Sequence, residues 1–172
     1  MTEYRACSPC GERYNRTMFD IAIIAVGKMR DPAFRMAAEE YLRRLTPFAK
    51  VTVMEIEAVP FRAEGEKERA QRKEAERIRL HLEKARGKAA IFLLDERGGE
   101  YSSEEFARFL GNEKKEVIFV LGGALGFTKE MKKEFSSIAL SRLTLPHELA
   151  RVVLLEQVYR AAAILNGKTY HY

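Results

Sequence analysis

The chain has 172 residues, which is long enough for one domain with a hydrophobic core but too short for a second domain of ordinary size. With 47% hydrophobic and 32% charged residues, its composition excludes a fibrous or intrinsically disordered protein. The formal net charge of +5 favours a polyanionic partner, although the solvated face of a basic helix would explain the same excess.

Residues 1–17 are polar and lack periodicity, so we expect an N-terminal extension without a role in the core, followed by a single domain over residues 18–172. Cys7 and Cys10 form a Cys-Ser-Pro-Cys pair in this extension. A structural zinc site needs about four ligands, and a thioredoxin-like redox pair follows a strand inside a βαβ unit. The sequence around the pair provides neither context, and we predict no metal.

The chain contains no apolar stretch near the roughly 18 residues of a membrane span, and no signal sequence opens it. We therefore expect a cytoplasmic protein that does not contact the membrane.

The first part of the chain predicts a strand, a helix and a second strand. The run FDIAIIAV over 19–26 is typical of a buried strand. Asp31 and Pro32 then predict a helix start, with apolar residues at helical spacing up to Pro47. A second strand is expected at 51–56.

A strongly basic helix is predicted next. Between Phe61 and Ala89 there are ten Lys or Arg residues against six Asp or Glu residues, a net charge of +4. The apolar positions form only one narrow stripe, so most of the helix surface should lie in water. The stripe consists of Ala75, Ile78, Leu82 and Ala85, in line with the polar Gln71 one turn before them.

The middle of the chain alternates strands and helices again. AAIFLLD over 89–95 predicts a third buried strand, after which Gly98 and Gly99 are expected to turn the chain. Ser102 and Glu105 have the spacing of a capping box and predict a helix that Gly111 ends.

The rest of the chain predicts two more strands and two more helices. A fourth strand is expected at 117–121, and Thr128 should cap a short helix after it. A fifth strand is expected at 138–145, and a final helix at 148–166. This order predicts an α/β fold with a mainly parallel sheet flanked by helices.

The final helix is apolar almost all round, and Gly167 follows it as a C-cap glycine. A helix of this kind is usually buried on more than one side. We therefore predict that it packs against a second subunit, forming a homodimer.

Three segments are candidates for chemistry. Glycines at 122, 123 and 126 follow the fourth strand, where backbone can approach a ligand, but they match neither the dinucleotide nor the phosphate-loop pattern, and a plain tight turn is the alternative. His147 begins the last helix, with Arg151 one turn on; it is a candidate base or a structural helix-start residue. The terminus 169–172, Thr-Tyr-His-Tyr, is a frayed end or a surface for stacking on a base.

These pieces together resemble the RlmH family of SPOUT-class methyltransferases, which act on a pseudouridine of large-subunit ribosomal RNA. The resemblance covers nearly all of residues 18–172, in order; its motifs are IAIIAVGKMRD, EYLRRL, FLLDERG, VLGGALGF, LSRLTLPHELARVVLLEQVYRA and the closing YHY. It implies a C-terminal deep trefoil knot, an exception to the usual absence of knots in proteins. It also implies S-adenosylmethionine as methyl donor, bound in a bent form in that knot.

The resemblance further implies the site residues. The cofactor would be held, largely by backbone atoms, by Leu94, Gly122 and the stretch Leu140, Ser141, Arg142, Leu143, Thr144 and Leu145. His147 or His171 would remove the N3 proton of the pseudouridine, and Arg151 would stabilise the negative charge on the ring. Tyr170 and Tyr172 would clamp the base, from the opposite subunit of the dimer.

Proteins of this family consist of little more than the catalytic domain and have no added RNA-binding module. The resemblance therefore implies that the dimer surface and the basic helix recognise 23S ribosomal RNA, within the large subunit or the assembled ribosome. Two alternatives remain open at this point. One is a SPOUT methyltransferase that acts on transfer RNA, and the other is a knotted, non-catalytic protein that binds RNA or the ribosome.

Overall fold

The structure is a computed structural model that describes residues 19–168 and 170. The predictions for the N-terminal extension, Cys7, Cys10, His171 and Tyr172 lie outside these residues. The elements in chain order are β1 (Phe19–Val26), α1 (Pro32–Leu45), β2 (Ala49–Ile56), α2 (Lys67–Leu82), β3 (Ala89–Glu100), α3 (Ser103–Asn112), β4 (Glu116–Leu121), α4 (Lys129–Glu134), β5 (Ser136–Ala139) and α5 (His147–Leu165), with short 3-10 turns at Glu64–Glu66 and Glu83–Ala85 on either side of α2.

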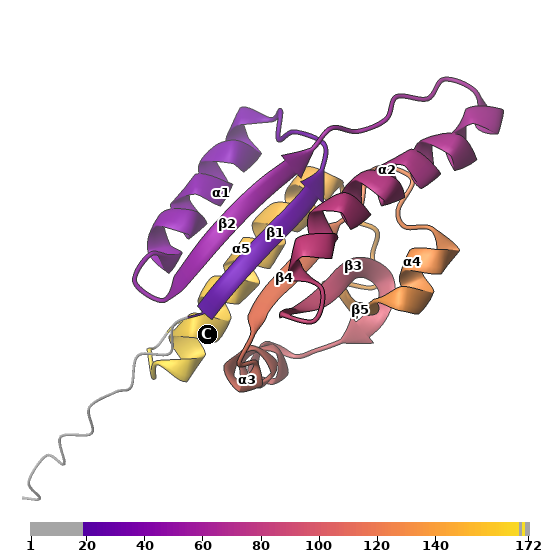
Figure 1. Cartoon of the computed structure of the whole chain (residues 1–172). Helices are drawn as coiled ribbons and strands as arrows, with labels where there is room; N and C mark the ends of the chain where they lie inside the picture. The colour runs from indigo at the N-terminus through magenta and orange to yellow at the C-terminus, as the bar shows by residue number, and fades with distance from the viewer. Residues whose placement is uncertain (1–18, 169, 171–172) are drawn as a thin grey trace, which may run out of the picture.

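The five strands form one sheet in the order β2-β1-β4-β3-β5, and every pair of neighbours is parallel. Helices cover both faces, with α1, α3 and α5 on one side and α2 and α4 on the other (Figure 1). The predicted α/β fold with a parallel sheet is therefore confirmed. The knot stays a prediction.

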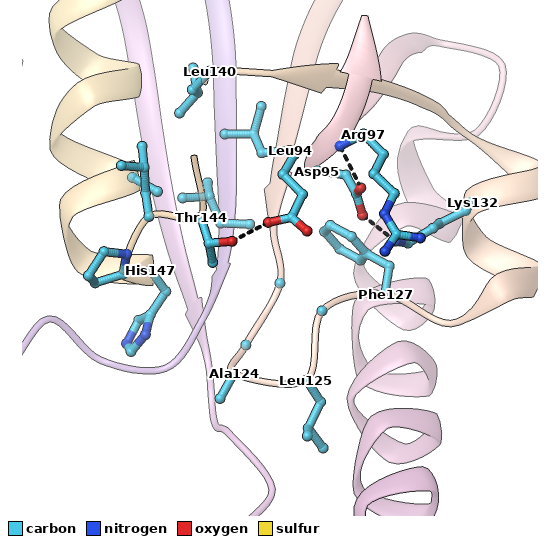
Figure 2. Close-up of a pocket in the computed structure, with 18 of the residues that line it drawn as sticks. Leu94, Asp95, Arg97, Ala124, Leu125, Phe127, Lys132, Leu140, Thr144 and His147 are labelled. Atoms are coloured by element: carbon cyan, nitrogen blue, oxygen red, sulfur yellow. Dashed lines mark hydrogen bonds and ion pairs between the residues drawn. The ribbon is translucent and has the colours of Figure 1, made fainter. Parts of the chain in front are cut away.

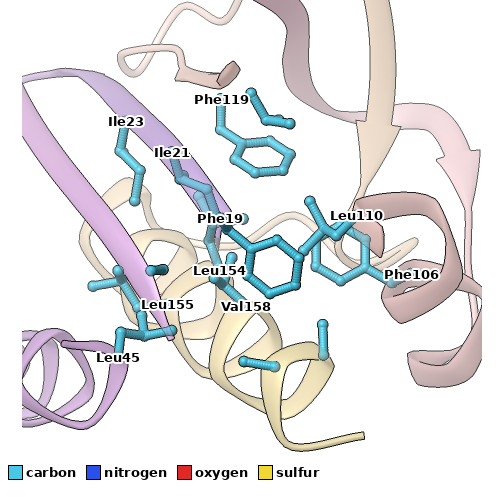
Figure 3. Close-up of a cluster of buried hydrophobic side chains, with 14 of the residues drawn as sticks. Phe19, Ile21, Ile23, Leu45, Phe106, Leu110, Phe119, Leu154, Leu155 and Val158 are labelled. Atoms are coloured by element: carbon cyan, nitrogen blue, oxygen red, sulfur yellow. The ribbon is translucent and has the colours of Figure 1, made fainter. Parts of the chain in front are cut away.

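Alternate residues of each central strand enter two separate cores, which explains the unbroken apolar runs of the sequence. In β1, Ile21 and Ile23 pack toward α5, whereas Ile24 and Val26 pack toward α2. Figure 3 shows the larger core, in which Phe119 of β4 lies among side chains from the sheet, α3 and α5. Both cores fix the positions of the strand ends that matter for the site.

The predicted turn at Gly98 and Gly99 is wrong, because β3 continues to Glu100. The strand pairs with β5 on both sides of an irregularity between Leu94 and Gly99. A Cβ at Gly98 would lie 2.6 Å from the backbone of Ile138. Glycine is needed here for the close approach of two strands, and not for a turn.

The fifth strand is shorter than predicted, since β5 ends at Ala139. Beyond Glu100, which pairs with Ala139, β3 offers no further partner. Residues 140–146 leave the sheet as an irregular segment, in which the Leu143 N–H donates to Ser141 Oγ at 3.0 Å.

The last helix is confirmed to within one residue at each end. After it, Gly167 adopts a φ of +63°, and the N–H groups of Gly167 and Lys168 donate to the carbonyls of Ile164 and Ala163. This is the Schellman pattern of a helix C-terminus. Within the subunit α5 packs on the sheet between α1 and α3. Among the helices of the described residues, none is long and apolar enough to cross a membrane.

Candidate functional site

A cavity of about 950 Å³ opens where β4 and β5 end, beside the irregularity of β3 that follows Leu94, and where α5 begins (Figure 2). In a parallel sheet the carboxyl ends of all strands share one edge, and ligands of such folds bind there. The cavity is bounded by a glycine-rich loop, by the irregular segment 140–146, and by a group of charged side chains.

The glycine-rich loop over 122–126 is tightly folded. The Gly126 N–H donates to the Gly123 carbonyl at 3.0 Å, and Gly126 has a φ of +62°. A Cβ at Gly122 would lie 3.3 Å from both the Gly126 Cα and the Phe127 ring. The loop therefore leaves main-chain atoms at the cavity wall, where they can contact a ligand directly.

Helix α2 holds this loop in place. Gln71 Nε2 donates to the carbonyl of Leu125 at 2.7 Å and to that of Phe127 at 3.3 Å. One turn on, Glu74 is buried and its Oε1 accepts from the Val59 N–H at 2.9 Å. Burial raises the pKa of the Glu74 carboxyl, against the lowering effect of the Val59 N–H. A Cβ at Gly123 would lie 2.9 Å from Glu74 Oε2 and 3.0 Å from Val26 Cγ1, so a side chain at this position would require one of these neighbours to shift.

All but one of the residues predicted to contact the cofactor line the cavity. The exception is Arg142, whose side chain is 86% exposed and forms only a loose pair with Glu100, at 3.8 Å. Thr144 Oγ1 donates to Glu96 Oε2 at 2.5 Å and so connects the segment 140–146 to the irregular part of β3. The predicted residues at the cavity are Leu94, Gly122, Leu140, Ser141, Leu143, Thr144 and Leu145.

Charged side chains line the opposite side of the cavity and were not identified from the sequence. Asp95 and Lys132 form an ion pair, and Asp95 Oδ1 also accepts from the Arg97 N–H at 3.0 Å (Figure 2). Burial alone would raise the pKa of Asp95, but the hydrogen bonds from Lys132 and Arg97 outweigh it and lower that pKa below its usual value. The Asp95 carboxylate is thus held ionised inside the cavity.

His147 lies at the mouth of the cavity, as the first residue of α5, with 41% of its side chain exposed. A Cβ at Gly27, which has a φ of +93°, would lie 3.4 Å from His147 Nε2. The neighbouring Glu148 accepts from the N–H groups of Arg30 and Asp31 at 2.9 and 3.0 Å. These contacts fix the start of α5 against the segment that follows β1.

Arg151 does not line this cavity but a second one, of about 410 Å³, on the α1 side. Its guanidinium pairs with Glu55 Oε1 at 2.6 Å and donates to the Gly27 carbonyl at 3.0 Å. Glu55 also accepts from the Met29 N–H at 3.1 Å. Burial alone would raise the pKa of Glu55, but the hydrogen bonds from Arg151 and Met29 lower it. Arg151 is therefore engaged within the subunit and joins α5 to the β1–α1 connection.

Tyr170 lies at the other end of α5. Its ring contacts Tyr159 with a centroid separation of 4.7 Å, and its carbonyl accepts from Arg160 at 3.2 Å. A hydrogen bond with Tyr170, together with burial, raises the pKa of Tyr41 to about 12. At 1.5 Å per helical residue, His147 and Arg160 are roughly 20 Å apart along the helix. One subunit therefore does not bring His147 and Tyr170 together.

A model described as "Predicted SPOUT methyltransferase" matches residues 19–171. The chain belongs to the SPOUT methyltransferase family. Two similar curated relatives carry the name ribosomal RNA large subunit methyltransferase H. The Carboxydothermus hydrogenoformans protein is 36% identical over 160 residues, or 88% of this chain and 99% of the relative. The Bacillus anthracis protein is 42% identical over 159 residues, with the same coverage of 88% and 99%.

A solved structure from Haemophilus influenzae Rd KW20, described as a probable methylase family protein, has a TM-score of 0.52 and 14% identity, and the match covers 88% of this chain and 68% of that one. At this identity it supports the fold alone. The SPOUT methyltransferase family predicted from the sequence motifs is confirmed. In this member, the segments that carry those motifs after β3, β4 and β5 meet at one cavity.

Proposed function

We propose that this SPOUT methyltransferase uses S-adenosylmethionine to methylate N3 of a pseudouridine in 23S ribosomal RNA of the large subunit, in the cytoplasm. The observation that carries the proposal is the similarity to proteins named ribosomal RNA large subunit methyltransferase H, at 36% to 42% identity over nearly their whole lengths. The cavity beside the ends of β4 and β5 supports it by offering a site for the methyl donor.

The cavity fits such a donor in size and character. Small-molecule sites typically measure about 300 to 1,000 Å³, and the volume here, about 950 Å³, lies in that range. Leu94, Leu140 and Leu145 supply an apolar surface suited to adenine, and the glycine-rich loop supplies exposed main-chain atoms. When bound, S-adenosylmethionine supplies an activated methyl group on a sulfonium, so the protein's main task is alignment of the acceptor.

His147 is our candidate for the base that takes the N3 proton of the pseudouridine. A positioned base contributes typically about 10²- to 10⁴-fold to a rate. The side chain lies at the cavity mouth and is partly open to solvent, where an incoming base can reach it. Proton transfer to His147 would leave N3 with the electron pair for the new N–CH3 bond, while the S–CH3 bond of the donor breaks and its sulfur leaves as a neutral thioether.

Arg151 is assigned a positioning role in this scheme. Direct contact with the negatively charged ring would require it to leave Glu55, to which it is bound at 2.6 Å. Its hydrogen bond to the Gly27 carbonyl holds the segment that packs against His147. Arg151 thereby orients the proposed base.

We propose a homodimer in which the tail of one subunit completes the site of the other. Tyr170 accepts a hydrogen bond from Arg160, which lies roughly 20 Å along α5 from His147 at the cavity of the same subunit. In a dimer joined through α5, Tyr170, His171 and Tyr172 would reach the partner's cavity, and Val152, Val153 and Ile164, which are only partly buried in one subunit, would be covered.

The exposed face of α2 is our candidate for RNA contact. Of its basic residues, Arg72 and Arg79 pair with Glu68 and Glu134, and Arg77 donates to a backbone carbonyl. Arg69 and Lys73 are exposed and form no ion pair with any described residue. Free surface cations of this kind are suited to phosphate contacts.

Mass spectrometry of ribosomal RNA from a strain that lacks the protein tests this function. We expect one pseudouridine of 23S RNA to lose a methyl group and to regain it when the gene is restored. Restoration by His147→Gln at the same protein level is expected to be much slower. An unchanged 23S modification pattern together with loss of a transfer RNA methyl would overturn the substrate, and failure of the folded protein to bind S-adenosylmethionine in calorimetry would overturn the enzyme.

A further inference from the structure

Asp95 and Lys132, on the charged side of the cavity, can form more hydrogen bonds than they form within the protein. The Asp95 side chain is only 9% exposed, and its two oxygens accept one hydrogen bond each, from Lys132 and from the Arg97 N–H. A carboxylate offers about four lone-pair sites, and a lysine ammonium has three donors. Asp95 can therefore accept further bonds, and Lys132, whose only ion pair within the described part of the chain is with Asp95, can donate further ones.

The cavity is divided into two chemically different sides. On one side lie Leu140, Leu145 and Pro146, from the segment before α5, together with Leu94, which precedes the irregularity of β3. On the other side lie the Asp95 and Lys132 pair, the latter from α4, as Figure 2 shows. A ligand that fits both must have an apolar end and an end with both signs of charge.

The opposite signs of these two side chains restrict further which class of ligand can bind. An anion such as phosphate would meet the buried carboxylate of Asp95 as well as Lys132, and like charges at close range disfavour such binding. A cation alone would meet Lys132 in the same way. A zwitterion places its ammonium on Asp95 and its carboxylate on Lys132, so both contacts are charge-assisted hydrogen bonds.

From this arrangement we propose that Asp95 and Lys132 bind the amino-acid end of S-adenosylmethionine, with Asp95 accepting from its α-ammonium and Lys132 donating to its α-carboxylate. The inference rests on the proposed function, since it assigns residues to the methyl donor of that reaction. It makes the pair a determinant of which adenosine derivatives the protein binds. The pair also sets the direction of the ligand in the cavity, with the adenine toward the leucines.

Calorimetry with two ligands tests the proposal. 5′-Methylthioadenosine shares the adenosine end but lacks the amino-acid end. For Asp95→Asn and Lys132→Gln we expect the Kd for S-adenosylmethionine to rise about 10- to 100-fold, the range for a lost charge-assisted hydrogen bond. The Kd for 5′-methylthioadenosine should stay within about twofold of the wild-type value. Binding of that ligand also shows that each variant is folded.

Matched controls are available in the chain. Lys133 is the neighbour of Lys132 on α4 but does not line the cavity, and Asp20 is an exposed acid at the start of β1. Lys133→Gln and Asp20→Asn should leave both Kd values unchanged. If Asp95→Asn and Lys132→Gln weaken both ligands equally, or weaken neither, the assignment is wrong.

A change in the ligand gives a second test, whose first comparison uses the wild-type protein alone. Decarboxylated S-adenosylmethionine keeps the ammonium but lacks the carboxylate. Wild-type protein should bind it about tenfold more weakly than S-adenosylmethionine, and Lys132→Gln should remove that difference. Equal binding of the two ligands by the wild type would overturn the role of Lys132. Failure of the wild type to bind S-adenosylmethionine at all would instead overturn the proposed function.

Discussion

The ion pair between Arg151 and Glu55 should contribute measurably to stability, and a double-mutant cycle can isolate its share. The Arg151 side chain is 4% exposed, whereas that of Glu55 is 36% exposed. Breaking a fully buried pair costs about 3–5 kcal/mol, and an exposed pair is worth about 0–1 kcal/mol. For this half-screened pair we expect Arg151→Met to lower the free energy of unfolding by about 2–3 kcal/mol.

The assay is urea unfolding followed by circular dichroism, at one fixed protein concentration so that any dimerisation contributes equally. The cycle combines Arg151→Met with Glu55→Gln, which keeps an acceptor but removes the charge. We expect a coupling energy of about 1–2 kcal/mol between the two changes. Arg142→Met, at an exposed arginine, is the control and should have little effect. A coupling within about 0.5 kcal/mol of zero would refute the reasoning, because independent sites behave in that way.

The same pair predicts a dependence on pH. Since the pKa of Glu55 is lowered in the folded protein from its ordinary value of 4.5, its ionised form stabilises the fold. That stabilisation is fully present above the unfolded pKa and is lost as the pH falls through the lower, folded pKa. The difference between wild type and Arg151→Met should therefore shrink in acid below about pH 4. A difference that stays constant from pH 7 into this range would contradict the assignment.

Three further outcomes are expected. Gly98→Ala should cost at least about 1–3 kcal/mol of unfolding free energy, because its Cβ would lie 2.6 Å from the Ile138 backbone, whereas Gly65→Ala, with nothing within 4 Å, should cost little. His147→Gln should lower kcat for methylation by about 10²- to 10⁴-fold while the Kd for S-adenosylmethionine changes far less, and an equal change in both would count against its role as base. Reversing the charge of Arg69 and Lys73 together should flatten the salt dependence of RNA binding by about one to two units of log–log slope, and an unaltered slope would exclude this face of α2.

The sequence was informative about the helix starts and about the glycine-rich loop. Asp31, Ser102 and Thr128 accept the N-cap hydrogen bonds expected of them. The glycine-rich loop was identified as a candidate because it follows a predicted parallel strand, and the carboxyl ends of such strands meet at one edge of the sheet. The segment before Pro146 was instead predicted as part of a strand over 138–145, whereas β5 ends at Ala139, and only the family resemblance assigned this segment to the cofactor.

The remaining features depend on partners that lie far away in the chain. Asp95 pairs with Lys132, and Arg151 pairs with Glu55 across 96 positions, so no local sequence pattern predicts either pair. Gly98 resembled an ordinary turn glycine because the neighbour that requires it, Ile138, belongs to another strand. Arg142 belongs to the segment 140–146 beside the cavity, but the direction of its side chain was not predictable from sequence.

Helix α2 connects the glycine-rich loop of the cavity with the surface proposed to contact RNA. Its inner side supplies Gln71, which fixes the glycine-rich loop through two carbonyls, and its outer side carries Arg69 and Lys73. A polyanion bound to the outer side would consequently lie at a fixed distance and direction from the cavity, because one continuous helix carries both contacts. Arg69 and Lys73 flank Gln71 within about one helical turn, so the rotation of about 100° per residue fixes the direction of these cations relative to the loop.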